Sequence, residues 1–305
     1  MLMLLSAQYL NQTFALVDAL TFSDGPHQRP MINIETDLCK AEISCQGGHL
    51  IAFTPRNERP IIWTSKDAIF AEGKAIRGGI PICWPWFGPH PDDTSKGGHG
   101  IARTAMWHVS NTLIDAQGNV KVTLKLNSCA QTKKIFPYHF DLELQFIFGT
   151  TLSVTLSATN TDVNPFVVTG ALHTYFGISD IDDICISGLE DVHYIDKLDN
   201  LKIKSSPKPI IFTEEVDRVY EKTDSTTMIN DPKWERKIIV KKSGSLATVI
   251  WNPWIEKCKT FVDMHDTEYR EMVCIEVANA GSDIITIPPG GTHQLSTTIS
   301  AHPLR

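Results

Sequence analysis

A histidine and a glutamate in distant parts of the chain are of the types that exchange protons with a ligand. His173 closes a Gly-Ala-Leu run whose small side chains leave room around an imidazole, and Glu276 lies in the apolar segment 272–277. On a strand, Glu276 shares one face with Met272 and Cys274. A carboxylate there is costly unless paired or used, and burial could raise its pKa toward neutrality. Together they suit general acid and base catalysis. The alternatives are a structural histidine and a strand with one solvated face.

A loop between residues 77 and 107 carries two arginines that could bind an anion. Arg77 begins the run Arg-Gly-Gly-Ile-Pro-Ile-Cys-Trp-Pro-Trp-Phe-Gly, and Arg103 ends His-Gly-Ile-Ala-Arg. Paired glycines allow a tight turn beside Arg77, and the prolines stiffen the residues after it. Each guanidinium offers a planar fork of donors that matches phosphate or carboxylate oxygens. The pattern indicates one wall of a ligand site; the alternative is surface ion pairs and plain core tryptophans.

Asp217 is a weaker candidate. It stands in the segment 216–220, outside any clear strand, where it could accept hydrogen bonds from ligand hydroxyls or simply pair with Arg218. The chain contains no G-x-S-x-G elbow, no H-E-x-x-H, no Walker loop and no dinucleotide fingerprint. Its glycine pairs indicate turns, because a phosphate-cradling loop needs a helix directly after it.

The composition is that of an ordinary globular protein with ample material for a core. The 305 residues are 42% hydrophobic and 21% charged. We expect a single domain over residues 1–305, with a lead-in segment at 1–30 and the catalytic domain at about 31–305. The formal net charge of -7 argues against nucleic acid as a partner, because phosphate backbones are bound by basic patches.

Cysteine usage and the chain start indicate an intracellular protein. The seven cysteines form no C-x-x-C pair, so we expect reduced thiols and neither a disulfide framework nor a metal site. The apolar residues 1–5 are too short for a signal core, and no segment has the length of a membrane span. We therefore expect a cytoplasmic monomer with no membrane partner.

Alternating apolar residues predict an antiparallel all-β protein, a large sandwich. One short helix is expected at 15–20. A hairpin is expected around residues 149–151, because glycine supplies the positive φ that tight hairpin turns need. Strands are expected at 32–35, 38–45, 49–54, 120–126, 142–148, 152–159, 166–173, 237–241, 246–251, 272–278, 284–287 and 294–300.

Five motifs in a fixed order carry a family resemblance. Besides the two arginine-containing runs, Ala-Leu-His-Thr-Tyr-Phe contains His173, Asp-Arg-Val-Tyr begins at Asp217, and Cys-Ile-Glu ends at Glu276. With these motifs, which lie within roughly residues 47–300, the chain resembles the glucose-6-phosphate 1-epimerases, or hexose-6-phosphate mutarotases, of the aldose 1-epimerase (galactose mutarotase-like) superfamily. The first motif is long and specific to the phosphosugar branch.

The resemblance implies a fold and a reaction. It implies a large β-sandwich of the galactose mutarotase-like type, with the sugar in an open cleft. It also implies interconversion of the α and β anomers of a hexose 6-phosphate without metal or organic cofactor. His173 would protonate the ring oxygen and Glu276 would take the proton of the anomeric hydroxyl, with the two groups on opposite sides of C1.

The resemblance also assigns binding residues. Asp217 would hold sugar hydroxyls, and Arg77 and Arg103 would face the phosphate. His99 would bind or polarise the sugar. Gly98 stands where some relatives carry a glutamine that contacts the ligand, so here that contact is missing or comes from the backbone. Trp84, Trp86 and Trp251 are candidates to cover the apolar side of the sugar, one of them being a plain core residue.

Three other functions stay open on the sequence. The first is an epimerase for unphosphorylated aldoses. The second is a glycoside hydrolase that uses Asp217 and Glu276 as its carboxylate pair. The third is a protein that binds a sugar phosphate without turning it over. The preferred hexose phosphate is not specified by any motif.

Overall fold

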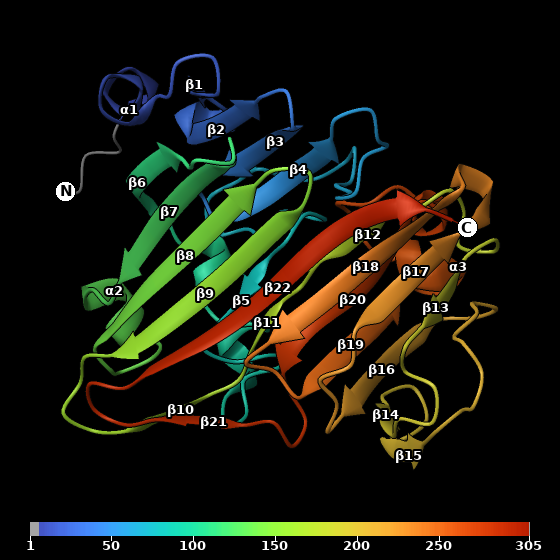
Figure 1. Ribbon diagram of the computed structural model, residues 1–305. Helices are drawn as coiled ribbons and strands as arrows, with labels where there is room; N and C mark the ends of the chain where they lie inside the picture. The colour runs from blue at the N-terminus through green and yellow to red at the C-terminus, as the bar shows by residue number, and fades with distance from the viewer. Residues whose placement is uncertain (1–5, 305) are drawn as a thin grey trace.

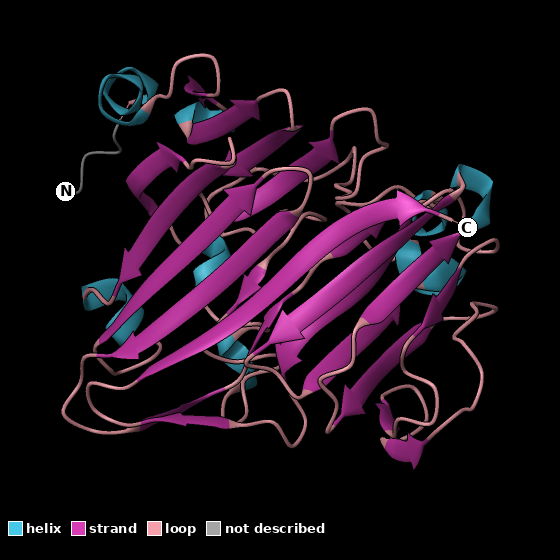
Figure 2. Ribbon diagram, viewed as in Figure 1, coloured by secondary structure: helices cyan, strands magenta, loops and turns pink. Residues whose placement is uncertain are grey.

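Two large antiparallel sheets form most of the structure, a computed structural model that describes residues 6–304 (Figures 1 and 2). The β9 sheet has eight strands in the order β13 (Cys185–Ser187), β17 (Thr227–Asp231), β18 (Arg236–Ser243), β22 (Thr292–Pro303), β9 (Leu152–Asn160), β8 (Phe140–Phe148), β7 (Val120–Asn127) and β6 (His108–Ile114). The β20 sheet also has eight, in the order β15 (Lys202–Lys204), β14 (Tyr194–Asp196), β16 (Val216–Glu221), β19 (Ala247–Asn252), β20 (Met272–Asn279), β11 (Gly170–Leu172) and β5 (Ile82–Cys83), with β12 (Tyr175–Gly177) also paired to β20. The predicted antiparallel sandwich is confirmed.

Smaller elements complete the fold. A four-stranded sheet contains β1 (Leu20–Asp24), β2 (Pro30–Glu35), β3 (Cys39–Ser44) and β4 (His49–Pro55), and β10 (Phe166–Val168) pairs with β21 (Ile285–Ile287). The α-helices are α1 (Ala7–Phe14), α2 (Ala130–Lys133) and α3 (Trp254–Cys258). Short 3-10 turns are η1 (Pro26–Gln28), η2 (Thr94–Lys96), η3 (Ala102–Thr104), η4 (Pro232–Trp234) and η5 (Glu268–Arg270). Within residues 6–304, no helix is both long and apolar enough to cross a membrane.

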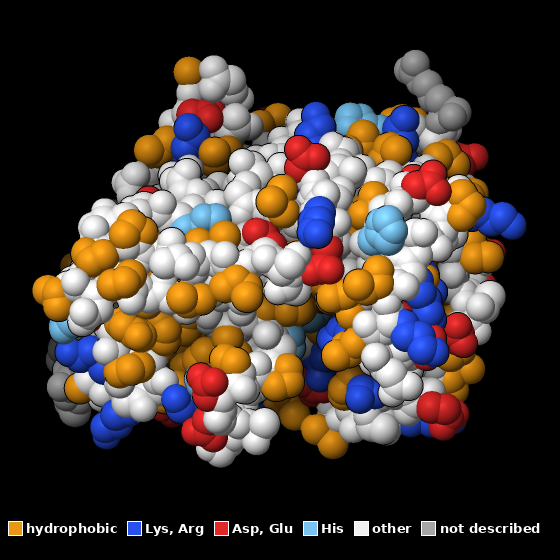
Figure 3. Space-filling view, turned by 90° about the horizontal axis from the view of Figure 1, so that it is seen from below, with side chains coloured by type: hydrophobic (Ala, Val, Ile, Leu, Met, Phe, Trp, Pro, Cys, Tyr) orange, Lys and Arg blue, Asp and Glu red, His pale blue; other side chains and the backbone are white. Residues whose placement is uncertain are grey.

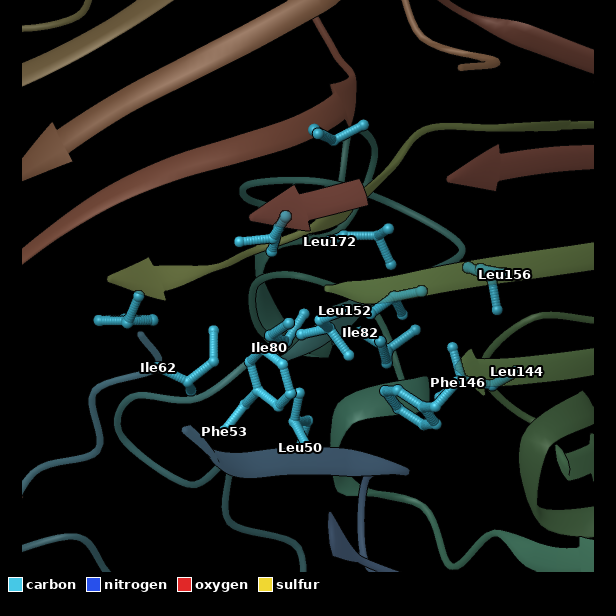
Figure 4. Packing of buried hydrophobic residues seen from close by; sticks show 14 of the residues in the cluster. Leu50, Phe53, Ile62, Ile80, Ile82, Leu144, Phe146, Leu152, Leu156 and Leu172 are labelled. Carbon is cyan, nitrogen blue, oxygen red and sulfur yellow. The ribbon is translucent and has the colours of Figure 1, made fainter. Parts of the chain in front are cut away.

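The sheets share one hydrophobic core. Figure 4 shows Ile82 and Leu172 of the β20 sheet close to Phe146 and Leu156 of the β9 sheet, with Phe53 of β4 closing the cluster from below. These five side chains are at most 3% exposed. Full burial of one such side chain stabilises the fold by roughly 1.5–3 kcal/mol, so this core fixes the position of the sheet that carries the site.

The β8–β9 hairpin follows the sequence prediction, but for a different physical reason. Phe148 pairs with Leu152 across the turn, as expected. The turn glycine, Gly149, is not among the glycines with positive φ. Instead, a Cβ atom at Gly149 would lie 2.1 Å from the side-chain oxygen of Asn119. Close packing against the Asn119 side chain, not backbone handedness, favours glycine here.

Strand β20 is buried on both faces. All eight residues of Met272–Asn279 are buried. Val273 and Ile275 belong to the core between the sheets, whereas Glu276 pairs with Val249 across to β19 and faces the opposite side. A solvated second face, one alternative for Glu276, is therefore wrong.

Three local predictions were wrong. The helix expected at 15–20 is instead α1 at Ala7–Phe14, and the supposed lead-in also supplies β1, which pairs with β2. The strand expected at 166–173 is divided at Thr169 into two strands. Before Thr169, β10 pairs with β21, and after it, β11 pairs with β20. Asp217 lies within strand β16, in a segment whose short strands show little alternation.

Candidate functional site

All six residues selected from the sequence line one cavity of about 300 Å³ on the face of the β20 sheet that points away from the core. In the register of the sheet, Asp217 is paired with Trp251, and Trp251 with Cys274, two residues before Glu276. Cross-strand partners point to the same side, so these residues share one face. The full lining is Arg77, Phe87, His99, Arg103, His173, Tyr175, Lys197, Asp217, Trp251, Phe261 and Glu276. In keeping with this lining, Figure 3 shows Lys or Arg and His side chains in a recess flanked by hydrophobic areas.

His173 and Glu276 are in direct contact. Nε2 of His173 lies 3.3 Å from Oε1 of Glu276, and the two side chains are 12% and 2% exposed. Within the described residues, Nδ1 of His173 and Oε2 of Glu276 have no hydrogen-bond partner. The His173 ring is stacked on Tyr175, with centroids 4.9 Å apart. The two side chains predicted to act as acid and base therefore lie side by side at the cavity.

Burial changes the proton affinity of both groups. Desolvation, followed by the charges of His99 and Arg103, lowers the pKa of His173 well below its ordinary value of 6.5. Desolvation and the nearby Asp217 raise the pKa of Glu276 well above 4.5. Both shifts favour the form of the pair in which Glu276 holds the proton and His173 is neutral. The sequence interpretation assumed an imidazole near its ordinary pKa and an ionised glutamate, and burial shifts both pKa values away from that combination.

We expect Glu276→Gln to stabilise the fold increasingly as pH rises. Because the folded pKa of Glu276 lies above the unfolded value of 4.5, its stabilising contribution is complete below that pH and is lost as pH rises toward the folded pKa. The uncharged amide escapes this loss. Melting temperatures of the two proteins from about pH 5 to about pH 9 should therefore diverge by a few degrees.

The matched control is Glu143→Gln, a half-exposed carboxylate on β8 paired with Lys125. Because this carboxylate is half-exposed and forms only a surface ion pair, its removal should change the melting temperature little. A constant difference for Glu276→Gln across the pH range would show that the carboxyl group ionises normally in the folded state.

His99 is held as a neutral hydrogen-bond donor. Its Nδ1 accepts a hydrogen bond from the backbone N–H of Gly88 at 3.3 Å, so the proton of the neutral ring is on Nε2. Burial first, and then the charges of Arg103, Lys197 and Arg77, lowers the pKa of His99 to about 3. The His99 ring centroid is 5.7 Å from that of His173. Its geometry fits a donor to a ligand oxygen.

Arg77 is fixed from several sides. Its Nε donates to Oδ1 of Asp263 at 3.1 Å, and Nη2 is 3.1 Å from the same oxygen. Nη1 lies 3.4 Å from the hydroxyl of Tyr175, and the guanidinium stacks over Phe261 at 4.2 Å. Gly78 has φ +102, and a Cβ there would lie 2.4 Å from Cα of Thr64. The turn that presents Arg77 therefore requires glycine, as predicted.

Arg103 is a cation without a carboxylate partner among the described residues. Its Nη2 donates to the backbone oxygen of Gly98 at 2.9 Å, and its buried Nε has no partner there. The backbone oxygen of Gly98 therefore orients Arg103. Gly100 brings this segment close to Trp84, because a Cβ at Gly100 would lie 2.0 Å from the Trp84 oxygen. The uncompensated charge of Arg103 favours an anionic ligand.

Asp217 pairs with a residue that the sequence analysis missed. Nζ of Lys197 lies 2.7 Å from Oδ2 of Asp217. The expected alternative partner, Arg218, is instead stacked over Tyr194 at 4.8 Å. Lys197 follows a three-residue strand in a polar segment, so no pattern identified it. Tyr175 was also missed, although its spacing of two from His173 would have placed it on the same face.

The three candidate tryptophans have different positions. Trp251 lines the cavity. Trp84 is 2% exposed and packs edge-on against Phe140 in the core, with ring centroids 4.6 Å apart. Trp86 donates to the Gly97 oxygen and lines a separate groove. Two of the three therefore lie outside this cavity, where one had been expected in the core.

Known proteins resemble the chain over most of its length. The family described as aldose 1-epimerase matches residues 30–300. A Cenchrus ciliaris protein named "Putative glucose-6-phosphate 1-epimerase" is 37% identical over 277 residues, or 87% of this chain and 82% of that protein. The crystal structure of a "putative mutarotase" from Salmonella typhimurium is 31% identical with a TM-score of 0.89, covering 95% of this chain and 96% of that one.

A more distant structure supports the fold. The galactose mutarotase related enzyme from Lactobacillus acidophilus has a TM-score of 0.71 at 16% identity, over 89% of this chain and 97% of that chain. At this identity the likeness concerns the fold alone. The expected galactose mutarotase-like sandwich is therefore confirmed.

Proposed function

The chain belongs to the aldose 1-epimerase family, and we propose that it interconverts the α and β anomers of a hexose 6-phosphate, in the first place glucose 6-phosphate. The observation that carries this proposal is the contact between His173 and Glu276 in a cavity that also contains the unpaired cation Arg103. The name of the Cenchrus ciliaris relative supports the phosphorylated substrate.

Anomer exchange needs coupled proton transfer at two neighbouring oxygens. The ring oxygen O5 gains a proton and the hydroxyl on C1 loses one as the ring opens. Because both oxygens are bonded to C1, two catalytic groups that lie 3.3 Å apart can each reach one of them. Protonated His173 donates to O5, ionised Glu276 accepts from O1, and rotation about the C1–C2 bond precedes closure on the other face.

The single proton of the pair accounts for both directions. Before ring opening the proton is on the imidazole; after opening, the glutamate carries the proton from O1 and His173 is neutral. Closure reverses both transfers. The pair therefore has the same net charge before and after each step, and no proton needs to be exchanged with solvent. This suits a buried site, where a change in net charge is expensive.

A bound phosphate would favour the protonated form of His173. The charges of Arg103 and Arg77 contribute to the low pKa of His173 in the empty cavity. An anion beside those guanidiniums offsets their effect, so the proton shifts from Glu276 toward the imidazole. Binding of the phosphate group thus produces the protonation state that opens the ring, which is an argument for a phosphorylated substrate over a free aldose.

The other candidate functions fit the geometry less well. A glycoside hydrolase with Asp217 and Glu276 as its carboxylate pair needs the second carboxylate to act at the scissile bond. Here an imidazole contacts Glu276, and Asp217 is paired with Lys197. A free-aldose epimerase would have no use for the uncompensated Arg103. A protein that only binds the ligand would not need the proton-sharing pair.

Magnetisation exchange between the anomeric protons of glucose 6-phosphate tests the proposal directly. We expect the protein to accelerate exchange above the rate in buffer, in proportion to its concentration. The same measurement on glucose separates phosphorylated from free substrates. Binding of glucose 6-phosphate without faster exchange would favour a sensor and would rule out the proposed activity.

A further inference from the structure

Lys197 is attached to Asp217 at two points. Its backbone N–H donates to the backbone carbonyl oxygen of Asp217 at 3.0 Å, and its Nζ lies 2.7 Å from the side-chain oxygen Oδ2 of Asp217. An ammonium group has three N–H donors, and among residues 6–304 no further hydrogen bond of Nζ is formed. Because Lys197 lines the cavity, its remaining donors are available to a ligand.

The order of strands in the β20 sheet places the site residues in sequence across the cavity. Arg103 lies at the β5 end, because the turn that carries it bonds through Ala102 N–H to the backbone oxygen of Trp84, directly after β5. Arg77 precedes β5 in the chain, but its guanidinium contacts Tyr175 of β12 and Phe261. His173 follows β11, the next strand. Then come Glu276 on β20, Asp217 on β16 and Lys197 after β14, in the strand order β5-β11-β20-β19-β16-β14.

A hexose 6-phosphate has a matching order of groups. Around the ring, the phosphate-bearing C6 is attached to C5, which is followed by O5, C1, C2 and C3. With the phosphate at Arg103, O5 at His173 and the C1 hydroxyl at Glu276, the C2 and C3 hydroxyls face the β16 side. Strands β20 and β16 are two strand spacings of about 4.8 Å apart, which leaves room for the ring and one hydrogen bond on either side.

We propose that Lys197 and Asp217 together recognise the vicinal hydroxyls at C2 and C3, with Lys197 donating to the C2 oxygen and Asp217 accepting from the neighbouring hydroxyl. This inference rests on the proposed function. A hydroxyl is both donor and acceptor, so an adjacent ammonium and carboxylate satisfy a diol in one orientation. Lys197 is thus a specificity residue for the C2 substituent.

Two other roles for Lys197 are distinguishable. As a further phosphate contact it would lie beside Arg103, but four strands of the sheet separate β5, next to the Arg103 turn, from β14. As a purely structural partner it would only keep Asp217 in place. That role would affect every substrate equally, whereas recognition of the C2 hydroxyl affects only substrates that carry one.

The test compares glucose 6-phosphate with 2-deoxyglucose 6-phosphate in the parent protein and in Lys197→Met. We expect the variant to lose at least about tenfold in kcat/KM on glucose 6-phosphate, the usual effect of removing a hydrogen bond to a charged group. On the 2-deoxy substrate the loss should be within about twofold, because the contact is already absent. Using both substrates with both proteins cancels the different intrinsic reactivity of the deoxy sugar.

Lys204→Met is the matched control. Lys204 has the same side-chain exposure as Lys197, 37%, and pairs with Asp196 at 2.8 Å, but it does not line the cavity. It should leave kcat/KM on both substrates unchanged. Lys197→Arg retains a donor and should keep most of the preference for the C2 hydroxyl, which tests the inference even if the methionine variant is unstable.

The outcomes separate this inference from the proposed function. If the parent protein does not accelerate exchange of glucose 6-phosphate, the proposed function fails. If it does, but Lys197→Met lowers kcat/KM equally on both substrates or on neither, the assignment of Lys197 to the C2 hydroxyl is wrong.

Discussion

Replacing His173 by asparagine or Glu276 by glutamine is expected to lower the catalysed rate of anomer exchange by about 10²- to 10⁴-fold. Each substitution removes a group that must give or take a proton while the ring opens. Both new side chains are of similar size and polar, so the cavity should keep its shape. Magnetisation exchange with glucose 6-phosphate measures kcat, and calorimetric titration measures whether the sugar phosphate still binds.

The double variant provides the sharper comparison. In the proposed mechanism His173 and Glu276, whose side chains lie 3.3 Å apart, act together, so loss of either group stops the coupled transfer. The double variant should therefore be about as slow as the slower single variant, instead of showing the product of the two losses. Multiplicative losses would indicate two groups that act independently. Nearly unchanged exchange in either single variant, with binding retained, would remove that residue from the catalytic pair.

The sequence predicts strands best where a sheet has one buried and one exposed face. In β9, buried and partly exposed residues alternate along the whole strand, as its sequence indicates. Strand β20 lacks this alternation because both of its faces are buried, although its apolar run still predicted a strand at 272–278. The three-residue strands β14 and β15 are shorter than any useful window. Their pairing, which positions Lys197, depends on contacts made elsewhere in the chain.

The contact between His173 and Glu276 illustrates a second limit. Residue types identify both as candidates, and the family resemblance assigns their roles. Their separation depends on the strand order, in which β11 lies next to β20 although about a hundred residues separate them along the chain. Likewise, the pKa directions follow from burial and from the charges of Asp217 and Arg103, which meet only in the folded chain. Neither the distance between His173 and Glu276 nor the directions of their pKa shifts can be derived from the local sequence.

Arg103→Met is expected to raise KM for glucose 6-phosphate by about 10- to 150-fold, the range for a lost hydrogen bond to a charged group, and to change kcat less. Arg103 has no carboxylate partner among the described residues, so its removal leaves no acid unpaired. Arg77→Met is a poorer test, because it would leave the half-buried Asp263 without its partner. Steady-state exchange rates over a range of substrate concentrations give KM and kcat separately.

The same Arg103→Met variant measured on free glucose completes the experiment. Without a phosphate there is no contact to lose, so any activity on glucose should remain within about twofold of the parent. Arg29→Met is a suitable control, since Arg29 is a largely buried arginine outside the cavity, paired with Glu72. Arg29→Met should leave KM and kcat unchanged on both glucose and glucose 6-phosphate. Equal losses on glucose and glucose 6-phosphate in Arg103→Met would mean that Arg103 shapes the loop instead of binding the phosphate, and an unchanged KM would favour an epimerase of unphosphorylated aldoses.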